Sequence, residues 1–204
     1  MSAPDPFSYP AKPHGRRHGP RGYRSYESYR DWLRDEFAFR CIYCLRRERW
    51  GQVKGEFDID HFEPQVRRGD LITEYDNLLY CCHTCNLAKG SRTVPDPHHH
   101  AYGNCLKVRE DGGIEALNEQ GEILIGELDL DAPTKVHWRR LWIRTVRVAW
   151  QSGDRAHLES VLGLPEDLPD LARQRPPDGN SRPEGLRDSW CVKQQRGELT
   201  DWLE

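Results

Sequence analysis

The sequence has no long apolar run. Of its 204 residues, 36 % are hydrophobic and 31 % are charged, and no stretch approaches the ~18 apolar residues of a membrane-spanning helix. The N-terminus also lacks the apolar core of a secretory signal peptide. These absences exclude a membrane-spanning class and favour a protein of the cytoplasm.

The supply of apolar residues is small, and the mean hydropathy is -0.87. A chain of this length is expected to form one domain with appendages. Its core should be small and in need of additional stabilisation. A structural metal ion can provide this, because its binding free energy becomes folding free energy.

The seven cysteines do not fit a disulfide framework. Four of them form two pairs with two-residue spacers, Cys41 with Cys44 and Cys82 with Cys85, and three remain: Cys81, Cys105 and Cys191. An odd remainder argues against disulfide pairing and agrees with a reducing compartment.

The two C-x-x-C pairs predict a closed four-cysteine zinc site. The two-residue spacer lets both thiolates of a pair reach one ion at about 2.3 Å. Isolated cysteines are often buried free thiols, and a redox pair would account for one C-x-x-C but not for two. Cys81 could replace Cys82 only by lengthening its spacer to three residues, so we expect Cys82 to be the ligand.

The formal net charge of -3 hides an uneven distribution. Residues 14–49 carry ten arginines against five acids, residues 110–131 carry eight acids and no Lys or Arg, and residues 133–155 are basic again. Local basic patches decide whether a polyanion can bind. A nucleic-acid partner is therefore allowed, though not required.

The pattern along the chain predicts three parts: a disordered basic arm at 1–22, a main domain at 23–151 and a helical, Pro-rich tail at 152–204. Within the main domain we expect a helix at 23–40, strands at 57–61 and 78–81, a long loop at 62–76, and a helix that starts at 83 and ends near Gly90. Further along we expect strands at 105–109, 114–117 and 123–128, then helices from Pro133 to about 151 and at 154–163, a linker at 164–185 and a last helix within 186–204.

Asp60 and His61 are the first candidates for catalysis. An imidazole can deprotonate water near neutral pH, and a divalent cation held by carboxylate or amide oxygens can neutralise a phosphate. Successive side chains of a regular strand point to opposite faces, so both residues could serve one centre only where the strand ends. An Asp-His pair alone is more often a surface ion pair, but here it lies between the two cysteine pairs.

Asn77, Asn86 and Lys89 are the next candidates. Asn86 follows Cys85 at the start of a helix, where its amide oxygen could bind a hard cation, and Lys89 lies one turn further, where it could meet a phosphate. Taken singly, each has an ordinary explanation: a helix cap for Asn86, a solvated charge for Lys89 and a turn for Asn77.

Together, these motifs resemble the HNH endonuclease family, in its HNN variant with zinc knuckles. The resemblance covers about residues 41–92 and rests on Cys41-x-x-Cys44, Ile59-Asp60-His61-Phe62-Glu63-Pro64, Asn77 and Cys82-x-x-Cys85-Asn86-x-x-Lys89-Gly90. It implies an α+β protein with a ββα-metal (His-Me finger) core, a structural zinc site of four cysteines, flanking helices and a small β-hairpin.

The resemblance also implies roles for single residues. His61 would be the general base, Asp60 and Asn86 would hold one catalytic Mg²⁺ or Mn²⁺, and Asn77 would brace the loop that orients His61. Asn86 stands where the family has His or Asn, and its oxygen makes a catalytic zinc less favourable, since zinc prefers nitrogen and sulfur donors.

The expected partner is DNA, cut with low sequence specificity. Arg140, Arg144 and Arg147 could follow a phosphate backbone, although a solvated helix face explains them equally well. The chain beyond Gly90 resembles, more loosely, stand-alone bacterial HNH proteins, some of which act in anti-phage defence. An ATPase or sensor protein is the kind of partner that would control such a nuclease.

Two other functions fit the same residues. A catalytically inert zinc-knuckle module that binds nucleic acid or protein needs the cysteines but assigns nothing to Asp60, His61 or Asn86. A ribonuclease on the same scaffold needs them all.

Overall fold

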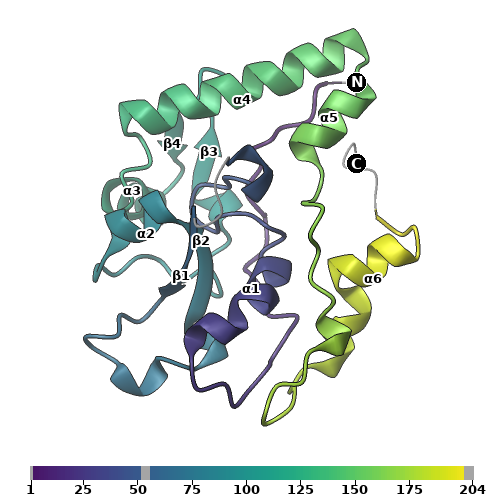
Figure 1. The fold of residues 1–204 in the computed structure, drawn as a ribbon. Helices are drawn as coiled ribbons and strands as arrows, with labels where there is room; N and C mark the ends of the chain where they lie inside the picture. Colours follow the sequence, from purple (N-terminus) through teal and green to yellow (C-terminus); the bar gives the residue numbers. More distant parts are fainter. Residues whose placement is uncertain (1, 52–55, 200–204) are drawn as a thin grey trace.

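A two-stranded antiparallel sheet followed directly by a helix forms the centre of the protein. The computed structural model describes residues 2–51 and 56–199. Strand β1 (Phe57–His61) pairs with β2 (Leu78–Cys82), with Phe57 opposite Cys82 and His61 opposite Leu78, and helix α2 (His83–Lys89) starts at the next residue. The fold is mixed α+β, and its ββα unit confirms the predicted core (Figure 1).

The predicted first helix is shorter than its periodic pattern suggested. A 3-10 turn at Tyr26–Tyr29 leads into α1 (Arg30–Glu36), and the chain then reverses at Ala38 and Phe39, both with positive φ, 51° and 57°. Their backbone N–H groups bond to the carbonyls of Asp35 and Arg34, which satisfies the open end of the helix. This reversal directs the chain into the first cysteine pair.

The second half begins with the predicted hairpin, β3 (Leu106–Val108) with β4 (Ile114–Ala116). The strand expected at 123–128 is wrong, because this segment belongs to helix α3 (Glu119–Glu127). The Asn118 side chain caps α3 by accepting a hydrogen bond from the Gly121 N–H. Leu124 and Leu128, four residues apart, are fully buried, so the apolar residues have helical rather than strand spacing.

Helix α4 (Pro133–Ser152) starts with proline in its first turn, as predicted. It passes over the hairpin and leads to α5 (Arg155–Leu162) (Figure 1). The indoles of Trp142 and Trp50 stack at 4.7 Å, so this face of α4 packs against the core. The last helix, α6 (Trp190–Gln195), falls within the segment 186–204, whose end at 200–204 lies outside the described residues.

The N-terminal segment is packed on the domain, whereas the sequence predicted a disordered arm. Phe7 is 1 % exposed and its ring lies 5.3 Å from that of Trp50. His18 is buried, with Nε2 at 2.8 Å from an oxygen of Asp35. A few aromatic rings and polar contacts hold the segment in place, and its described residues form no helix or long strand. Its sequence therefore shows no periodic apolar pattern. The division into three parts stays a prediction.

The buried carboxylate of Glu36, at the end of α1, binds the backbone of the basic N-terminal segment. Both oxygens of Glu36 accept backbone hydrogen bonds, from the N–H groups of Arg17 and His18. Burial alone would raise the pKa of Glu36, but the hydrogen bond from His14 and the charge of Arg16 lower it to about 2. Glu36 is therefore ionised, and the N-terminal segment compensates its charge.

In the described part of the chain, no helix has the combination of length and apolar character that a bilayer span requires.

Replacing Phe7 by Ala tests the packing of the N-terminal segment. Removing a fully buried phenyl ring leaves a cavity beside Trp50, and we expect the free energy of unfolding to fall by about 3–5 kcal/mol. Urea denaturation followed by fluorescence measures it. Val66→Ala, at a side chain that is 84 % exposed, is the control and should change stability by less than about 0.5 kcal/mol. Equal midpoints for the two variants would contradict the packing.

Candidate active site

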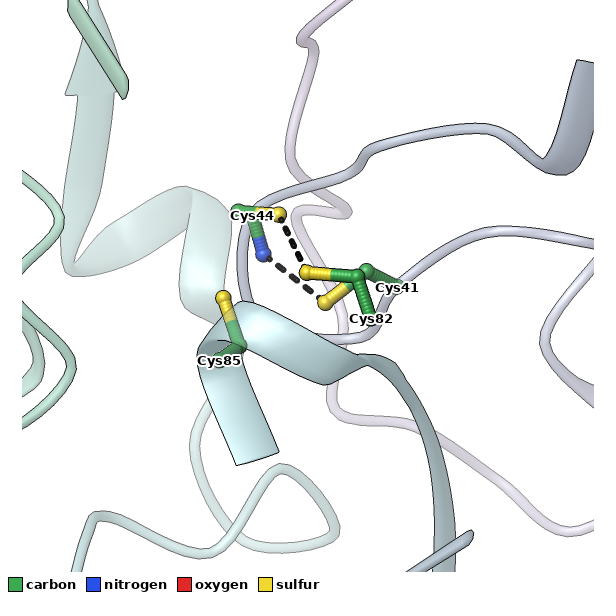
Figure 2. Close-up of side chains that lie close together, drawn as sticks. All are labelled: Cys41, Cys44, Cys82 and Cys85. Carbon is green, nitrogen blue, oxygen red and sulfur yellow. Dashed lines mark hydrogen bonds between the residues drawn. The ribbon is translucent and has the colours of Figure 1, made fainter. Parts of the chain in front are cut away.

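Four cysteines from two distant segments converge beside the ββα unit. Cys41 and Cys44 lie in the loop after α1, Cys82 ends β2, and Cys85 lies in the first turn of α2. Their sulfurs all lie within 4.8 Å of one another and all four residues are buried. Figure 2 shows the side chains pointing toward a common centre.

The geometry and the chemistry of this cluster fit zinc. A tetrahedron with arms of about 2.3 Å has edges of about 3.8 Å, and Cys44 Sγ lies 3.6 Å from Cys82 Sγ. Hydrogen bonds from Cys41 and Cys44 lower the pKa of Cys82, whereas burial raises the pKa of Cys41, so Cys82 is the member of the cluster that favours the thiolate. Cys81 is buried but outside the group, which confirms the choice of Cys82.

The Asp60 carboxylate is buried and bound on both oxygens. Lys89 Nζ lies 3.0 Å from Oδ1, and the Tyr43 hydroxyl donates to Oδ2 at 2.6 Å. Burial, and then the charge of Asp60, raises the pKa of Tyr43 well above its usual value, so the hydroxyl keeps its proton. Tyr43 lies inside the first cysteine pair, so one hydrogen bond joins the carboxylate to that cysteine knuckle.

The His61 ring lies on the other side of β1 and is fixed through both nitrogens. Its Nε2 is 2.9 Å from the carbonyl oxygen of Ile72, an acceptor only, so Nε2 carries the proton of the neutral ring. Nδ1 is then unprotonated, and it accepts a hydrogen bond from the side-chain amide nitrogen of Gln65 at 3.0 Å. The ring of Tyr26 packs edge-on against His61 at 4.8 Å.

Asn77 holds the loop that supplies the Ile72 carbonyl. Its Oδ1 accepts from the Glu63 N–H at 2.8 Å, and its Nδ2 donates to the carbonyls of Glu63 and Leu71. These bonds connect the residue before β2 to the start of the loop at Glu63 and to its interior at Leu71. The loop therefore keeps its shape around His61.

Asn86 has a partner that the sequence did not indicate. Its Nδ2 lies 3.0 Å from Oδ2 of Asp58, and the same oxygen meets Nδ1 of His83 at 2.8 Å. With Nδ2 bound, the amide oxygen of Asn86 is left for another partner. Asp58 is two residues before Asp60 and so lies on the same face of β1. This alternation in the sequence could have indicated Asp58 as a further site residue, and His83 is its partner in the structure.

Of the residues expected to bind nucleic acid, Lys89 is buried and the three arginines lie on α4. Lys89 is 0 % exposed and donates to Asp60 and to the His61 carbonyl, so in this arrangement it faces a carboxylate and not a phosphate. Arg144 and Arg147 lie on α4, with Arg147 3.2 Å from Glu110. Arg140 donates to the carbonyl of Asp111 at 2.8 Å.

A protein-family model described as HNH endonuclease matches residues 41–92. The chain contains an HNH endonuclease domain. The matched residues run from Cys41 to just past α2, so they include both cysteine pairs, the two strands and the helix. Comparison with curated proteins and with solved structures gives no match.

The HNH domain contains both the four cysteines and the polar residues Asp58, Asp60 and His61. HNH endonucleases are generally phosphodiester hydrolases, so a nucleic acid is the expected ligand of this domain. In the described residues, the His, Cys, Asp and Glu side chains that converge in a group of three or more are the four cysteines. The cysteine cluster is therefore the candidate structural metal site, and it does not include Asp58, Asp60 or His61.

Loss of one cysteine ligand tests the structural zinc. Cys85→Ser should remove the metal and lower the melting temperature strongly, because metal binding contributes folding free energy in the HNH domain. Zinc content by atomic absorption and thermal unfolding measure the two effects. Cys191→Ser, which lies outside the cluster, should keep the zinc of the wild type. Full zinc content in Cys85→Ser would contradict the site.

Lys89→Met tests the buried ion pair of the HNH domain. The substitution keeps an apolar stem but leaves the Asp60 charge buried with Tyr43 alone, which should cost about 3–5 kcal/mol of stability. Chemical denaturation measures the loss, with the exposed Lys107→Met as control. The double variant Asp60→Asn, Lys89→Met should recover part of it. A single variant as stable as the wild type would show that the pair does not form.

Proposed function

We propose that the protein is a metal-dependent endonuclease that hydrolyses DNA phosphodiester bonds with His61 as the general base. The observation that carries this proposal is the fixed His61 ring, whose Nε2–H is held by the Ile72 carbonyl while Nδ1 keeps its lone pair. A general base needs this combination of a set orientation and an unprotonated nitrogen. An inert zinc module has no use for it.

In this mechanism, Nδ1 of His61 accepts the proton of the attacking water. The Gln65 amide that meets Nδ1 belongs to an exposed residue, so it can move aside or hold that water beside the ring. As the ring gains its proton, the Ile72 carbonyl stabilises the imidazolium through the Nε2–H bond. Asn77 contributes by holding the loop in place.

Asp60 and Asn86 would hold the catalytic Mg²⁺ or Mn²⁺, since carboxylate and amide oxygens are the donors that such hard cations prefer. Bound there, the ion would neutralise the scissile phosphate and its leaving oxygen. Asp58 supports this role by binding Nδ2 of Asn86, which leaves Oδ1 free. Lys89 now compensates the charge of Asp60, and a cation held by that carboxylate would take over this compensation.

DNA is the substrate we favour, with cleavage of low sequence specificity and 5′-phosphate and 3′-hydroxyl ends. Arg144 and Arg147 on α4 supply charge that can follow any phosphate backbone. A ribonuclease is the second candidate, because the residues around His61 act on the phosphate and not on the sugar. Parallel digestion of DNA and RNA of one sequence separates the two.

We extend the proposal to a defence or restriction role in the cytoplasm, controlled by an ATPase or sensor protein. It rests on the resemblance of the chain beyond Gly90 to stand-alone HNH proteins. Phage plating on cells that carry the wild type or His61→Ala tests it, and equal plating on both would remove this extension while leaving the nuclease proposal intact.

Plasmid cleavage in Mg²⁺ or Mn²⁺ tests the catalytic roles. His61→Ala should slow cleavage by about 10²–10⁴-fold, the usual contribution of a general base. Asn86→Ala should also slow it and raise the metal concentration needed for half-maximal rate, whereas Asn77→Ala should lower the rate without changing that concentration.

His99→Ala is the matched control, because this side chain is 78 % exposed and lies outside the HNH match. It should cleave at the wild-type rate. Circular dichroism and zinc content establish that each variant is folded. Cleavage by folded His61→Ala at the wild-type rate would refute the assignment of the base.

A further inference from the structure

A cavity of about 320 Å³ lies between the N-terminal segment and the reversal after α1. Among the residues that line it are four basic ones, Lys12, His14, Arg40 and His100, and two aromatic ones, Phe37 and Tyr102. The volume is at the lower end of the range for small-molecule sites. The Phe37 and Tyr102 rings are themselves buried, and His14 stacks on Phe37, so the basic groups decide the ligand: they suit a small molecule that carries an anionic group.

Arg40 is the residue that makes this cavity unusual. It is half-buried, and its Nε has no exposed surface and no hydrogen-bond partner. Within the described residues, its guanidinium takes part in no ion pair and no side-chain hydrogen bond. A partly desolvated guanidinium without a counter-ion has a free-energy cost, and a bound anion would reduce that cost.

The neighbours of Arg40 add positive charge. Arg47 faces it across an isolated antiparallel bridge and is itself 8 % exposed, with its Nη1 donated to the carbonyl of Leu162. Lys12 is exposed at the cavity. Two arginines of like charge side by side and a nearby lysine produce a local field that attracts an anion.

Glu36 is the acid among the lining residues, and it does not neutralise Arg40. Its Oε1 accepts from the Arg17 N–H and lies 3.3 Å from His14 Nε2, and its Oε2 accepts from the His18 N–H and the Tyr75 hydroxyl. All its contacts are with the N-terminal segment and Tyr75. The charge of Glu36 is therefore compensated elsewhere.

The backbone that carries Arg40 is strained. Ala38 and Phe39, the two residues before it, both have positive φ, a conformation that costs non-glycine residues about 1 kcal/mol or more each. Such strain persists where the surrounding structure fixes it and is frequent at ligand sites. Here the strained reversal presents Arg40 to the cavity.

We propose that this cavity binds a phosphate group of a mononucleotide-sized ligand, with Arg40 as its principal partner and Lys12 at its rim. The phosphate could come from a free nucleotide or from the 5′ end of a DNA strand. The site is independent of the nuclease chemistry proposed above, because it uses no residue of the His61 or Asn86 groups.

Calorimetric titration of the zinc-loaded full chain with deoxyadenosine 5′-monophosphate tests the site. The nucleotide should bind and inorganic phosphate should compete with it, while deoxyadenosine, which lacks the phosphate, should not bind. Arg40→Gln should weaken nucleotide binding by about tenfold or more. Arg24 is exposed and does not line the cavity, so Arg24→Gln should bind the nucleotide as the wild type does.

The melting temperature without ligand separates a ligand-binding arginine from a structural one. Removing an uncompensated buried charge should leave Arg40→Gln as stable as the wild type or more stable, and only the wild type should gain stability from the nucleotide. If Arg40→Gln does not fold, Lys12→Gln replaces it, with a several-fold loss of affinity expected.

The source of the phosphate is distinguished with a 5′-phosphorylated oligodeoxynucleotide and its unphosphorylated twin on the His61→Ala background. Preference for the phosphorylated strand over the free nucleotide identifies a DNA end, and the reverse identifies a nucleotide. Equal binding of the nucleotide by wild type and Arg40→Gln, or no binding of nucleotide or phosphate by the wild type at matched ionic strength, would overturn the proposal.

Discussion

The four-cysteine cluster is the constraint on which the rest of the structure depends. A two-stranded hairpin is at best marginally stable by itself, and β1 with β2 has only α2 added directly after it. Cys82 closes β2 and Cys85 lies in the first turn of α2, so a metal ion bound there fixes the angle between strand and helix. That junction in turn sets where Asn86 stands relative to Asp58.

The same cluster is coupled to the proposed active site through Tyr43 and Asp60. Tyr43 stands between Cys41 and Cys44 and donates to Asp60, whose other oxygen is bound by Lys89 of α2. The carboxylate therefore connects the first cysteine pair, β1 and α2 in one buried network. Such networks are rigid when every member is satisfied. Rigidity here positions β1, and through it the His61 backbone, whose carbonyl also accepts from Lys89.

Sequence reasoning succeeded where spacing determines structure and failed where tertiary contacts do. The cysteine spacing indicated the four cysteines that converge, and Pro133 marked the start of α4. The segment 123–128 contains apolar residues that suit a strand, and only the Asn118 cap and the helical spacing of Leu124 and Leu128 decide for α3. The carbonyl that fixes the His61 tautomer belongs to Ile72, and no side-chain pattern indicates which backbone group will lie there.

The N-terminal segment shows how buried acids can order a basic, Pro-rich stretch. Helix α1 buries Asp35 and Glu36, at 0 % and 4 % exposure, and burying two carboxylates is costly unless each is paired and hydrogen-bonded. His18 meets Asp35, and the backbone at 17–18 meets Glu36. The ordered segment therefore supplies partners for the two buried carboxylates of α1. It also forms one wall of the cavity at Arg40. A change in the N-terminal segment should in this way affect both the stability of α1 and the proposed phosphate site.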